Sequence, residues 1–424
     1  MKKEILLIIC LFVCFVSRSQ EPETKWQAID YKTYIELVWK QNLNYAAEKL
    51  NVSIAEAELK AAKVFNNPNL SVAYADNDER RMQMGRSVSV ELGKTFSIGK
   101  RQAGINLAKS EKELNEALLT DYFHRLRAEA TLAYFEALKQ KELYYIKDYS
   151  CTNLRRLAES DSIRFSLGKI TESDYIQSRI EAEAATNELL TVRAEMYNAY
   201  ASLNVWTGVF SQDALYDPAG KLQAIEKPFN SGELLETALN NRADLAAALK
   251  NVDVSKKQLK VIRRERNMDF DFALGYNYNT EVRNEIAPAP KFNGVTAGIS
   301  IPLKFSNLNK GAVQAAELRR QQAEVNYRQA ELEVQNSVMQ SLRNYISFVE
   351  QVKNYENGLL ERVETVLAAK IYSYKRGETS RLEVLVAQQS YNERQTAYIE
   401  TVFNSIAALI ELERNVGVWD IEVE

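Results

Sequence analysis

Two short stretches of similar sequence each place an acidic residue at the same distance from a glycine. In FSLGKITESDYIQSR, Asp174 follows Gly168 by six positions, and in YKRGETSRLEVLVAQ, Glu383 follows Gly377 by six positions. Glycine readily adopts the left-handed backbone that ends a helix. The two stretches therefore predict two related turns between helices, at about 165–174 and 374–383.

Hydroxyl residues in both turns can cap the helix that follows. Thr171 in the first turn, and either Thr379 or Ser380 in the second, offer a side-chain oxygen to the free N–H groups of the next helix. A carboxylate is also favourable at a helix N-terminus. Taken alone, Asp174 and Glu383 are therefore most simply interpreted as helix-capping residues.

The remaining polar residues predict no catalytic centre. His124 is the single histidine and lacks the partner ligands of a metal site, and Glu331 and Glu333 are typical of the solvated face of a long helix. We find no phosphate-binding glycine loop and no arrangement for nucleophilic catalysis. A net charge of −3 gives no basic footprint for nucleic acid. We expect no enzyme, no cofactor and no nucleic-acid partner.

The N-terminus predicts export. Two lysines precede the apolar run Ile5–Val16, and small residues follow, so residues 1–19 are interpreted as a cleaved signal peptide. Twelve apolar residues are too few to span a bilayer. Cleavage leaves Cys151 as the sole cysteine, so no disulfide is expected within one chain. No later stretch is apolar enough for a transmembrane helix, so a membrane-inserted form must use strands.

The chain contains an internal duplication. Residues 42–60 match residues 242–260 at an offset of 200, and Gly168 and Gly208 match Gly377 and Gly417 at an offset of 209. We predict a first repeat over 20–208, a linker over 209–231, a second repeat over 232–417 and a tail over 418–424. Each repeat has the order helix, strand, strand, long helix, break, helix.

Four segments alternate apolar residues with small or polar ones, which is typical of strands with one apolar face. The predicted strands lie at about 69–76 and 86–96 in the first repeat, and at about 268–279 and 294–304 in the second. Strands of this length suit an outer membrane when they are tilted.

The helices are long. Residues 30–64 have helical composition, and a helix from about 101 to 165 would span roughly 100 Å. The segments 30–64 and 173–206 together are about as long as that helix, so two short helices stacked end to end would pair with one long helix. The same arithmetic holds in the second copy. There Val338, Leu342, Tyr345, Val349 and Val352 have coiled-coil spacing.

Four strands cannot close a barrel. An open sheet in lipid would leave edge groups unsatisfied at several kcal/mol each. Three copies would supply twelve strands, so the fold class we predict is mostly α, with a trimeric 12-stranded transmembrane β-barrel. The alternative is a soluble pair of hairpins packed on helices.

These features resemble the TolC-like outer-membrane efflux family over nearly the whole mature chain. The resemblance is carried by the duplicated plan, the junctions PLKFSNLNKGA and ELGKTFSIGKRQA, and the glycine-centred turns. The first junction is most similar to the branch that serves heavy-metal and other small-molecule RND pumps. The resemblance implies a homotrimer in outer-membrane lipid with a long periplasmic α-helical barrel as its tunnel. It also implies a periplasmic adaptor protein and an inner-membrane pump of the RND type or another type.

The resemblance also implies roles for particular residues. Gly168, Thr171, Gly377 and Thr379 would form tunnel tips that dock on the adaptor. Asp174 and Glu383 would form a cation-attracting constriction of six carboxylates in a trimer. Val386 departs from the family pattern, because some relatives carry a second acid there.

Three further residues would mark the junction between barrel and tunnel: Gly99, Pro302 and Gly311. Proline, which donates no hydrogen bond, suits the point where strand pairing ends. The function implied is a passive exit duct of a tripartite efflux system. A duct for type I protein secretion and a soluble periplasmic coiled-coil scaffold remain as alternatives.

Overall fold

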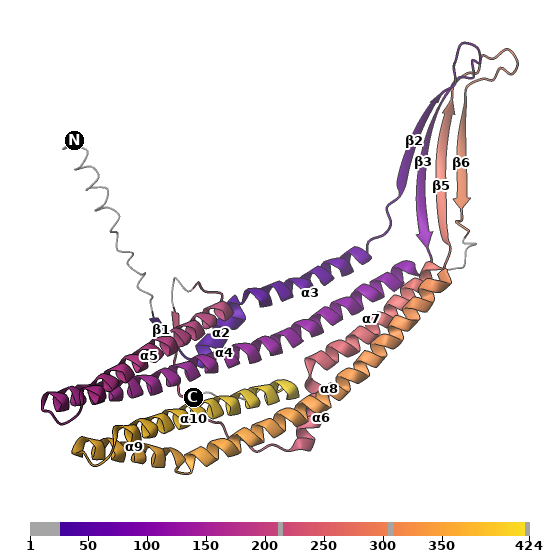
Figure 1. Cartoon of the computed structure of the whole chain (residues 1–424). Helices are drawn as coiled ribbons and strands as arrows, with labels where there is room; N and C mark the ends of the chain where they lie inside the picture. The colour runs from indigo at the N-terminus through magenta and orange to yellow at the C-terminus, as the bar shows by residue number, and fades with distance from the viewer. Residues whose placement is uncertain (1–25, 211–214, 304–308, 420–424) are drawn as a thin grey trace, which may run out of the picture. The chain divides into compact units, whose positions relative to one another are not determined.

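The structure is a computed structural model that describes residues 26–210, 215–303 and 309–419 (Figure 1). The predicted signal peptide, residues 1–19, and most of the predicted tail lie outside these ranges. Within them long helices predominate, and both halves of the chain follow the same order of helices and paired strands. No helix in the described ranges carries an apolar stretch long enough to cross a lipid bilayer.

The chain forms two compact units, and each repeat contributes to both. The sheet unit consists of Ala47–Phe123 and Leu239–Asn336. The tip unit consists of Met1–Ala46, His124–Ala238 and Ser337–Glu424. Helices α4 (Lys100–Ser166) and α8 (Lys310–Glu356) run from one unit into the other.

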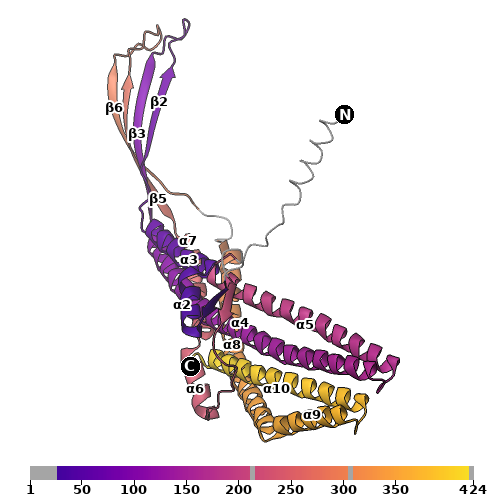
Figure 2. The same ribbon diagram turned by 90° about the vertical axis from the view of Figure 1, so that its left-hand side faces the viewer.

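The sheet unit contains one antiparallel sheet of four strands, to which each repeat contributes a hairpin (Figure 2). The first repeat supplies β2 (Asn69–Asp76) and β3 (Arg86–Ser97), and the second supplies β5 (Asp269–Asn279) and β6 (Phe292–Ser300). The order is β2-β3-β5-β6, so the repeats join through β3 and β5. Strands β2 and β6 are the edges of this sheet.

One face of the sheet is apolar and uncovered in the single chain. The register sets Val72 opposite Val90, and Val90 opposite Tyr276, so these side chains share one face. Its exposed large side chains include Leu70, Val72, Tyr74, Val88, Val90, Leu92, Leu274 and Tyr276. An apolar face of this size needs a partner other than water.

The fourth strand ends earlier than the alternation predicts. The prediction places it at about 294–304, whereas β6 ends at Ser300 and the next three residues are in no strand. Ser300 is already opposite Asp271, near the start of β5, so little of that strand remains to pair with. Pro302 has no N–H to continue the pairing. Residues 304–308 lie outside the described ranges.

The helical segment before each pair of strands is broken, and the prediction of one helix over 30–64 is wrong. The break falls at Asn42 in the first repeat and at Arg242 in the second. The side chain of Asn42 accepts the N–H of Tyr45 at 2.9 Å and donates to the carbonyl oxygen of Trp206 at 3.1 Å, so it replaces helical hydrogen bonds. The four helices are α2 (Tyr31–Gln41), α3 (Leu43–Ala62), α6 (Ser231–Asn241) and α7 (Ala243–Glu265).

The long helices differ between the two repeats. Helix α4 spans Lys100–Ser166, where the sequence predicts a helix from about 101 to 165. In the second repeat the corresponding run is divided, because α8 ends at Glu356 and α9 (Leu359–Arg376) follows Gly358, whose φ is 82°. The stripe with coiled-coil spacing on α8 is buried along its whole length, from Val338 to Val352.

Helices α5 (Glu172–Thr207) and α10 (Arg381–Val416) complete the tip unit. Its most deeply buried apolar side chains come from α2, α4, α5, α8 and α10, and include Val38, Leu126, Leu138, Leu203, Val338, Ile406, Leu409 and Ile410. Apolar residues from both repeats therefore form this core.

The predicted linker over 209–231 contains a strand that the sequence analysis does not identify. There β4 (Leu215–Pro218) pairs in parallel with β1 (Trp26–Ile29). The hydroxyl of Tyr134 lies between two carbonyl oxygens of this small sheet, 3.0 Å from that of Ile29 and 2.5 Å from that of Ala219. Four residues per strand give too weak an alternation to be recognised in a sequence.

Candidate functional site at the helical tips

The first tip is the turn between α4 and α5, and its sequence dictates its geometry. Gly168 has a φ of 65°, and the N–H of Lys169 bonds the carbonyl oxygen of Arg164 at 2.8 Å, which closes the end of α4. Thr171 is the N-cap of α5, and it forms a capping box with Asp174. Only five residues therefore separate the end of α4 at Ser166 from the start of α5 at Glu172.

Asp174 is exposed and its carboxylate takes part in that cap. The Thr171 hydroxyl donates to Oδ2 of Asp174 at 2.7 Å, and the N–H of Asp174 donates back at 3.2 Å. The N–H of Thr171 also donates to Oδ2 of Asp174, at 3.3 Å. The two hydrogen bonds from Thr171 to the carboxylate, with a further contribution from the nearby Arg381, lower the pKa of the Asp174 carboxyl below its ordinary value. Asp174 is therefore an ionised, solvent-facing carboxylate at neutral pH.

The second tip, between α9 and α10, is built in the same way but capped by a different residue. Gly377 has a φ of 79°, and Ser380 is the N-cap of α10. Of the two candidate caps, the structure assigns the role to Ser380, whose hydroxyl accepts the N–H of Glu383 at 3.4 Å. Thr379 lies beside the Glu383 carboxylate and lowers its pKa.

Glu383 is held by a lysine of the preceding helix. The Nζ of Lys370 lies 2.5 Å from Oε2 of Glu383. This hydrogen bond is the largest cause of a Glu383 pKa of about 2, against an ordinary 4.5. Both predicted constriction residues are thus fully ionised near neutral pH, although a cation of the chain already neutralises one of them.

Two contacts tie the tips of the repeats to each other. The hydroxyl of Tyr374, on α9, donates to Oδ1 of Asp161, on α4, at 2.8 Å. Arg381, at the start of α10, donates to the backbone carbonyl oxygen of Asp174 at 2.7 Å and to the carboxylate of Glu181 at 2.6 Å. Three of these groups are side chains with little or no exposure to solvent, so water competes weakly for the contacts.

The Asp161 contact joins a fully buried carboxylate to a buried phenol. The side chain of Asp161 is 0% exposed, and Arg164 lies 3.6 Å from its Oδ1 and also 4.6 Å from the centre of the Tyr374 ring. Burial, and then the hydrogen bond to Asp161, raise the pKa of Tyr374 to about 12. A buried carboxylate that loses its partners is strongly destabilising, so this cluster favours the packed arrangement of the tips.

Neither contact can be predicted from residues close together in the sequence, although the duplication carries a signal for one of them. Asp161 and Lys370 occupy equivalent positions 209 residues apart, as do Phe165 and Tyr374. At both positions the copies differ in charge or polarity. Where packed copies make a contact between unlike side chains, equivalent positions of the copies can differ, and the differences at these two positions are the signal that the sequence carries.

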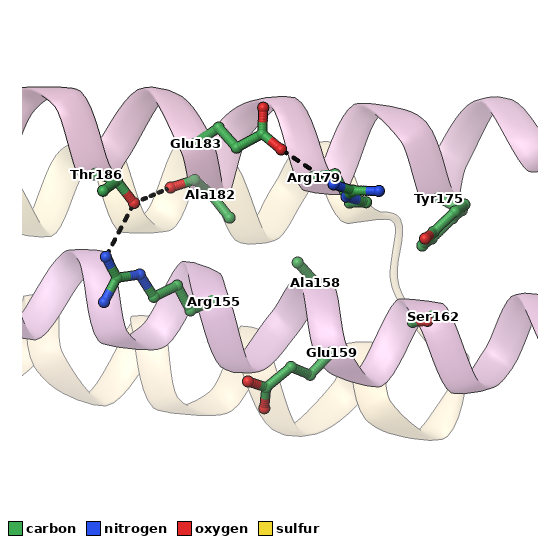
Figure 3. Close-up of a pocket in the computed structure, with 9 residues that line it drawn as sticks. All are labelled: Arg155, Ala158, Glu159, Ser162, Tyr175, Arg179, Ala182, Glu183 and Thr186. Atoms are coloured by element: carbon green, nitrogen blue, oxygen red, sulfur yellow. Dashed lines mark hydrogen bonds and ion pairs between the residues drawn. The ribbon is translucent and has the colours of Figure 1, made fainter. Parts of the chain in front are cut away.

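A pocket of about 360 Å³ lies between α4 and α5 beside the first tip (Figure 3). Arg155 donates to the hydroxyl of Thr186 at 3.1 Å, and Arg179 lies 3.3 Å from a carboxylate oxygen of Glu183. Both arginines are thus engaged by side chains of the chain itself. The residues that line this pocket include no histidine or cysteine, and they suggest a packing surface rather than a reaction centre.

The three predicted junction residues lie where strands give way to helices in the sheet unit. Gly99, with a φ of 75°, separates β3 from α4. Pro302 follows the end of β6 by two positions, and Gly311 is in the first turn of α8. Across the described ranges, no group of three or more His, Cys, Asp and Glu side chains is arranged to hold a metal ion.

Comparisons with known proteins agree with this architecture. The model of the outer membrane efflux protein family matches residues 234–418. The cobalt-zinc-cadmium resistance protein CzcC of Cupriavidus metallidurans is 24% identical over 380 residues, which cover 89% of this chain and 87% of that protein.

Solved structures share the fold over nearly the whole chain. CusC has a TM-score of 0.75 at 18% identity, with 95% of this chain and 96% of that chain covered. The outer membrane channel CmeC of Campylobacter jejuni has a TM-score of 0.75 at 15% identity, with 95% and 90% covered. The second repeat thus matches the outer membrane efflux protein family, and the first repeat has the same order of helices and strands.

Proposed function

We propose that three copies of this chain form a passive exit duct in the outer membrane. Substrates would reach it from an inner-membrane pump of the RND type, through a periplasmic adaptor protein. No residue of the duct needs to perform chemistry, because the pump supplies the energy. The duct supplies only a continuous path across the outer membrane and towards the pump.

The four-stranded sheet carries this proposal. Its apolar face is exposed, and its edge strands β2 and β6 have no neighbour on their outer sides among the described residues. Backbone groups on such edges must be satisfied when the sheet enters lipid, where each unpaired group costs several kcal/mol. If β6 of one copy pairs with β2 of the next around a closed ring, the edge backbone groups of every copy are hydrogen-bonded. Three copies give an even number of strands, as known outer-membrane barrels have.

The tips are the proposed gate and docking surface. Asp174 and Glu383 are placed at the starts of α5 and α10, and a ring of three copies would bring six carboxylates around one axis. We assign Gly168, Thr171, Gly377 and Thr379 to the turns that meet the adaptor. Opening requires the contacts between repeats at Asp161 and Arg381 to yield, and the adaptor drives it by binding the open arrangement more tightly.

We further propose that the exported substrates are divalent metal cations. The relative CzcC is named for resistance to cobalt, zinc and cadmium. Exposed carboxylates at a constriction would attract such ions without holding them in a coordination site, as a conduit requires. The ions are substrates in transit, and the protein needs no resident metal.

Deletion and complementation of the gene test this function. Loss of the gene should lower the concentrations of Co²⁺, Zn²⁺ and Cd²⁺ that stop growth, and the purified protein should form pores in planar lipid bilayers. A deletion strain that tolerates these metals but fails to export a polypeptide would support type I secretion instead. A protein released by osmotic shock that never conducts would support the soluble scaffold.

A further inference from the structure

Charged side chains on the apolar face of the sheet occur at its two ends. At the end near the loops, Asp76 and Arg86 stand opposite each other and form an ion pair of 3.1 Å. At the end near the helices, Lys94 projects from the same face of β3, in line with Val90 and Leu92. Between these ends the described face of β3 is apolar.

The spacing of these charges is slightly smaller than the height of the apolar band of an outer-membrane barrel. Eight residues separate Arg86 from Lys94 along β3, which is roughly 27 Å at the rise of an antiparallel strand. If β3 is tilted by 35–45° from the membrane normal, Arg86 and Lys94 are about 20 Å apart along that normal. The apolar band of outer-membrane barrels is about 25 Å tall. With the apolar band centred on this face, Lys94 would lie within a few ångströms of the level where acyl chains give way to headgroups.

Lys94 has aromatic neighbours but no acidic partner. Its Nζ lies 5.4 Å from the centre of the Phe96 ring, and Phe96 packs edge-on against Phe272 with ring centres 5.4 Å apart. Within the described ranges, no carboxylate forms an ion pair with Lys94. A flexible stem along apolar surface with a free ammonium at its end is typical of lysines that reach from lipid to a phosphate layer.

Two arginines continue the basic surface past the end of the strand. The guanidinium of Arg101 lies 3.9 Å from the centre of the ring of Phe65, which is 66% exposed, and it donates to the carbonyl oxygen of Lys63. The side chain of Arg264 lies against Gly99, where an added Cβ would be 3.5 Å from its Nε. Neither arginine has a carboxylate partner in the described part of the chain. We call Lys94, Arg101 and Arg264 the collar.

The collar lies in a region whose charge differs from that of the whole chain. The segments 60–66, 94–101 and 260–271 contain nine lysines and arginines but three acids, whereas the chain as a whole carries a net charge of −3. Two of those acids are already engaged, Asp269 by Lys100 at 2.5 Å and Asp271 by Thr95 at 2.5 Å. Two of the nine cations are paired as well, Lys100 with Asp269 and Arg263 with Glu317 at 3.1 Å, and the remaining excess of positive charge lies where the sheet meets the helices.

We propose that the collar binds the phosphate groups of phospholipids in the leaflet that faces the periplasmic helices, and so sets the depth of the sheet in the membrane. This inference rests on the proposed function, because it requires the sheet to lie in lipid. Exposed aromatic rings and unpaired cations, interleaved at one level, complement a surface that is apolar on one side and anionic on the other. A soluble protein partner would not account for the apolar band that continues from Lys94 along β3.

The proposal is tested with full-length protein in a neutral detergent, titrated with fluorescent phosphatidylglycerol. The triple variant Lys94→Gln, Arg101→Gln and Arg264→Gln should bind this lipid more weakly, by roughly fivefold for each cation removed. A matched variant removes three exposed lysines outside the collar: Lys40→Gln, Lys109→Gln and Lys221→Gln. This control should bind phosphatidylglycerol as the wild type does.

Competition experiments identify the ligand, and conductance separates this proposal from the proposed function. Unlabelled phosphatidylglycerol should displace the probe, whereas inorganic phosphate at the same concentration should not. Equal affinity of the collar variant, the control variant and the wild type would overturn the proposal, as would displacement by inorganic phosphate alone. If the wild type forms pores in planar bilayers but its collar does not affect the binding of phosphatidylglycerol, only the proposal about the collar is overturned. Absence of pores in the wild type would overturn the duct itself.

Discussion

The phenol of Tyr374, in the second repeat, donates a 2.8 Å hydrogen bond to the buried carboxylate of Asp161, in the first. The partners are 213 positions apart in the chain, and neither is one of the acidic residues at the starts of α5 and α10. If the tips open by separating the two repeats, this contact must break. It is therefore a determinant of how stable the closed arrangement is.

Removing the hydroxyl of Tyr374 should favour the open tip. Tyr374→Phe leaves the packing of the ring but deprives the buried Asp161 carboxylate of a donor, which costs about 1–3 kcal/mol. The expected result is a higher single-channel conductance in planar bilayers. Tyr372→Phe, two positions earlier and 61% exposed in the wild type, is the control and should conduct as the wild type does. Equal conductance of the two variants would show that the Asp161 contact does not restrain the tip.

The ion pair between Arg381 and Glu181 should contribute more to stability than an exposed pair nearby. These side chains are 11% and 21% exposed, whereas those of Arg179 and Glu183 are 59% and 68% exposed. Double-mutant cycles with glutamine, followed by thermal unfolding in detergent, should give a coupling of about 1–3 kcal/mol for the first pair and about 0.3–0.5 kcal/mol for the second. A coupling at Arg381 no larger than that at Arg179 would contradict this prediction.

The contact between Glu383 and Lys370 should survive mild acid. The pKa of Glu383 falls from an ordinary 4.5 to about 2 in the folded chain, so its contribution is fully present above pH 4.5 and is lost as pH falls towards 2. Any cation dependence of the current that involves Glu383 should therefore persist at pH 4. In Lys370→Gln, Glu383 should lose its negative charge at a higher pH, closer to 4.5, because the hydrogen bond that chiefly lowers its pKa is absent. If the cation dependence of the current varied with pH in the same way in the wild type and in Lys370→Gln, Lys370 would not be the cause of the lowered Glu383 pKa.

Neutralising Asp174 and Glu383 together should weaken the block of the channel current by divalent cations. If Asp174 and Glu383 line the constriction, the double variant Asp174→Asn and Glu383→Gln should lose block of the current by divalent cations. Glu172→Gln with Glu378→Gln removes two exposed acids of the same tips and serves as the control. Unaltered block in the first variant would restrict Asp174 and Glu383 to helix capping and ion pairing.

The sheet could be predicted from the sequence because its signal is local. In β2, β3 and β5, apolar residues alternate with small or polar ones over eight or more positions, and each strand lies close to the predicted range. The interruptions of the helices at Asn42 and Gly358 are harder to predict from the sequence than the strands are. Asparagine is compatible with a helix, and its role at position 42 depends on the carbonyl oxygen of Trp206, far away in the sequence.

The tip was predictable in part for the same reason. The glycines and hydroxyl residues of each turn act within a few positions, and the capping box at Thr171 depends on residues three apart. The Asp161 and Arg381 contacts depend instead on which faces of distant helices meet. Composition and spacing carry no information on this, apart from the unlike residues at equivalent positions of the two repeats.

A closed barrel requires pairing between the sheets of neighbouring copies, and cysteine cross-linking in membranes can detect this pairing. Val72, on β2, and Ala297, on β6, project from the same face of the sheet, at opposite edges. In a closed barrel of three copies, Val72→Cys with Ala297→Cys should give cross-linked products of two and three chains and none larger. Val72→Cys with Val90→Cys, which are opposite each other within one chain, should give only monomers. Monomers alone from the edge pair, or a ladder continuing beyond three chains, would contradict the closed three-copy barrel.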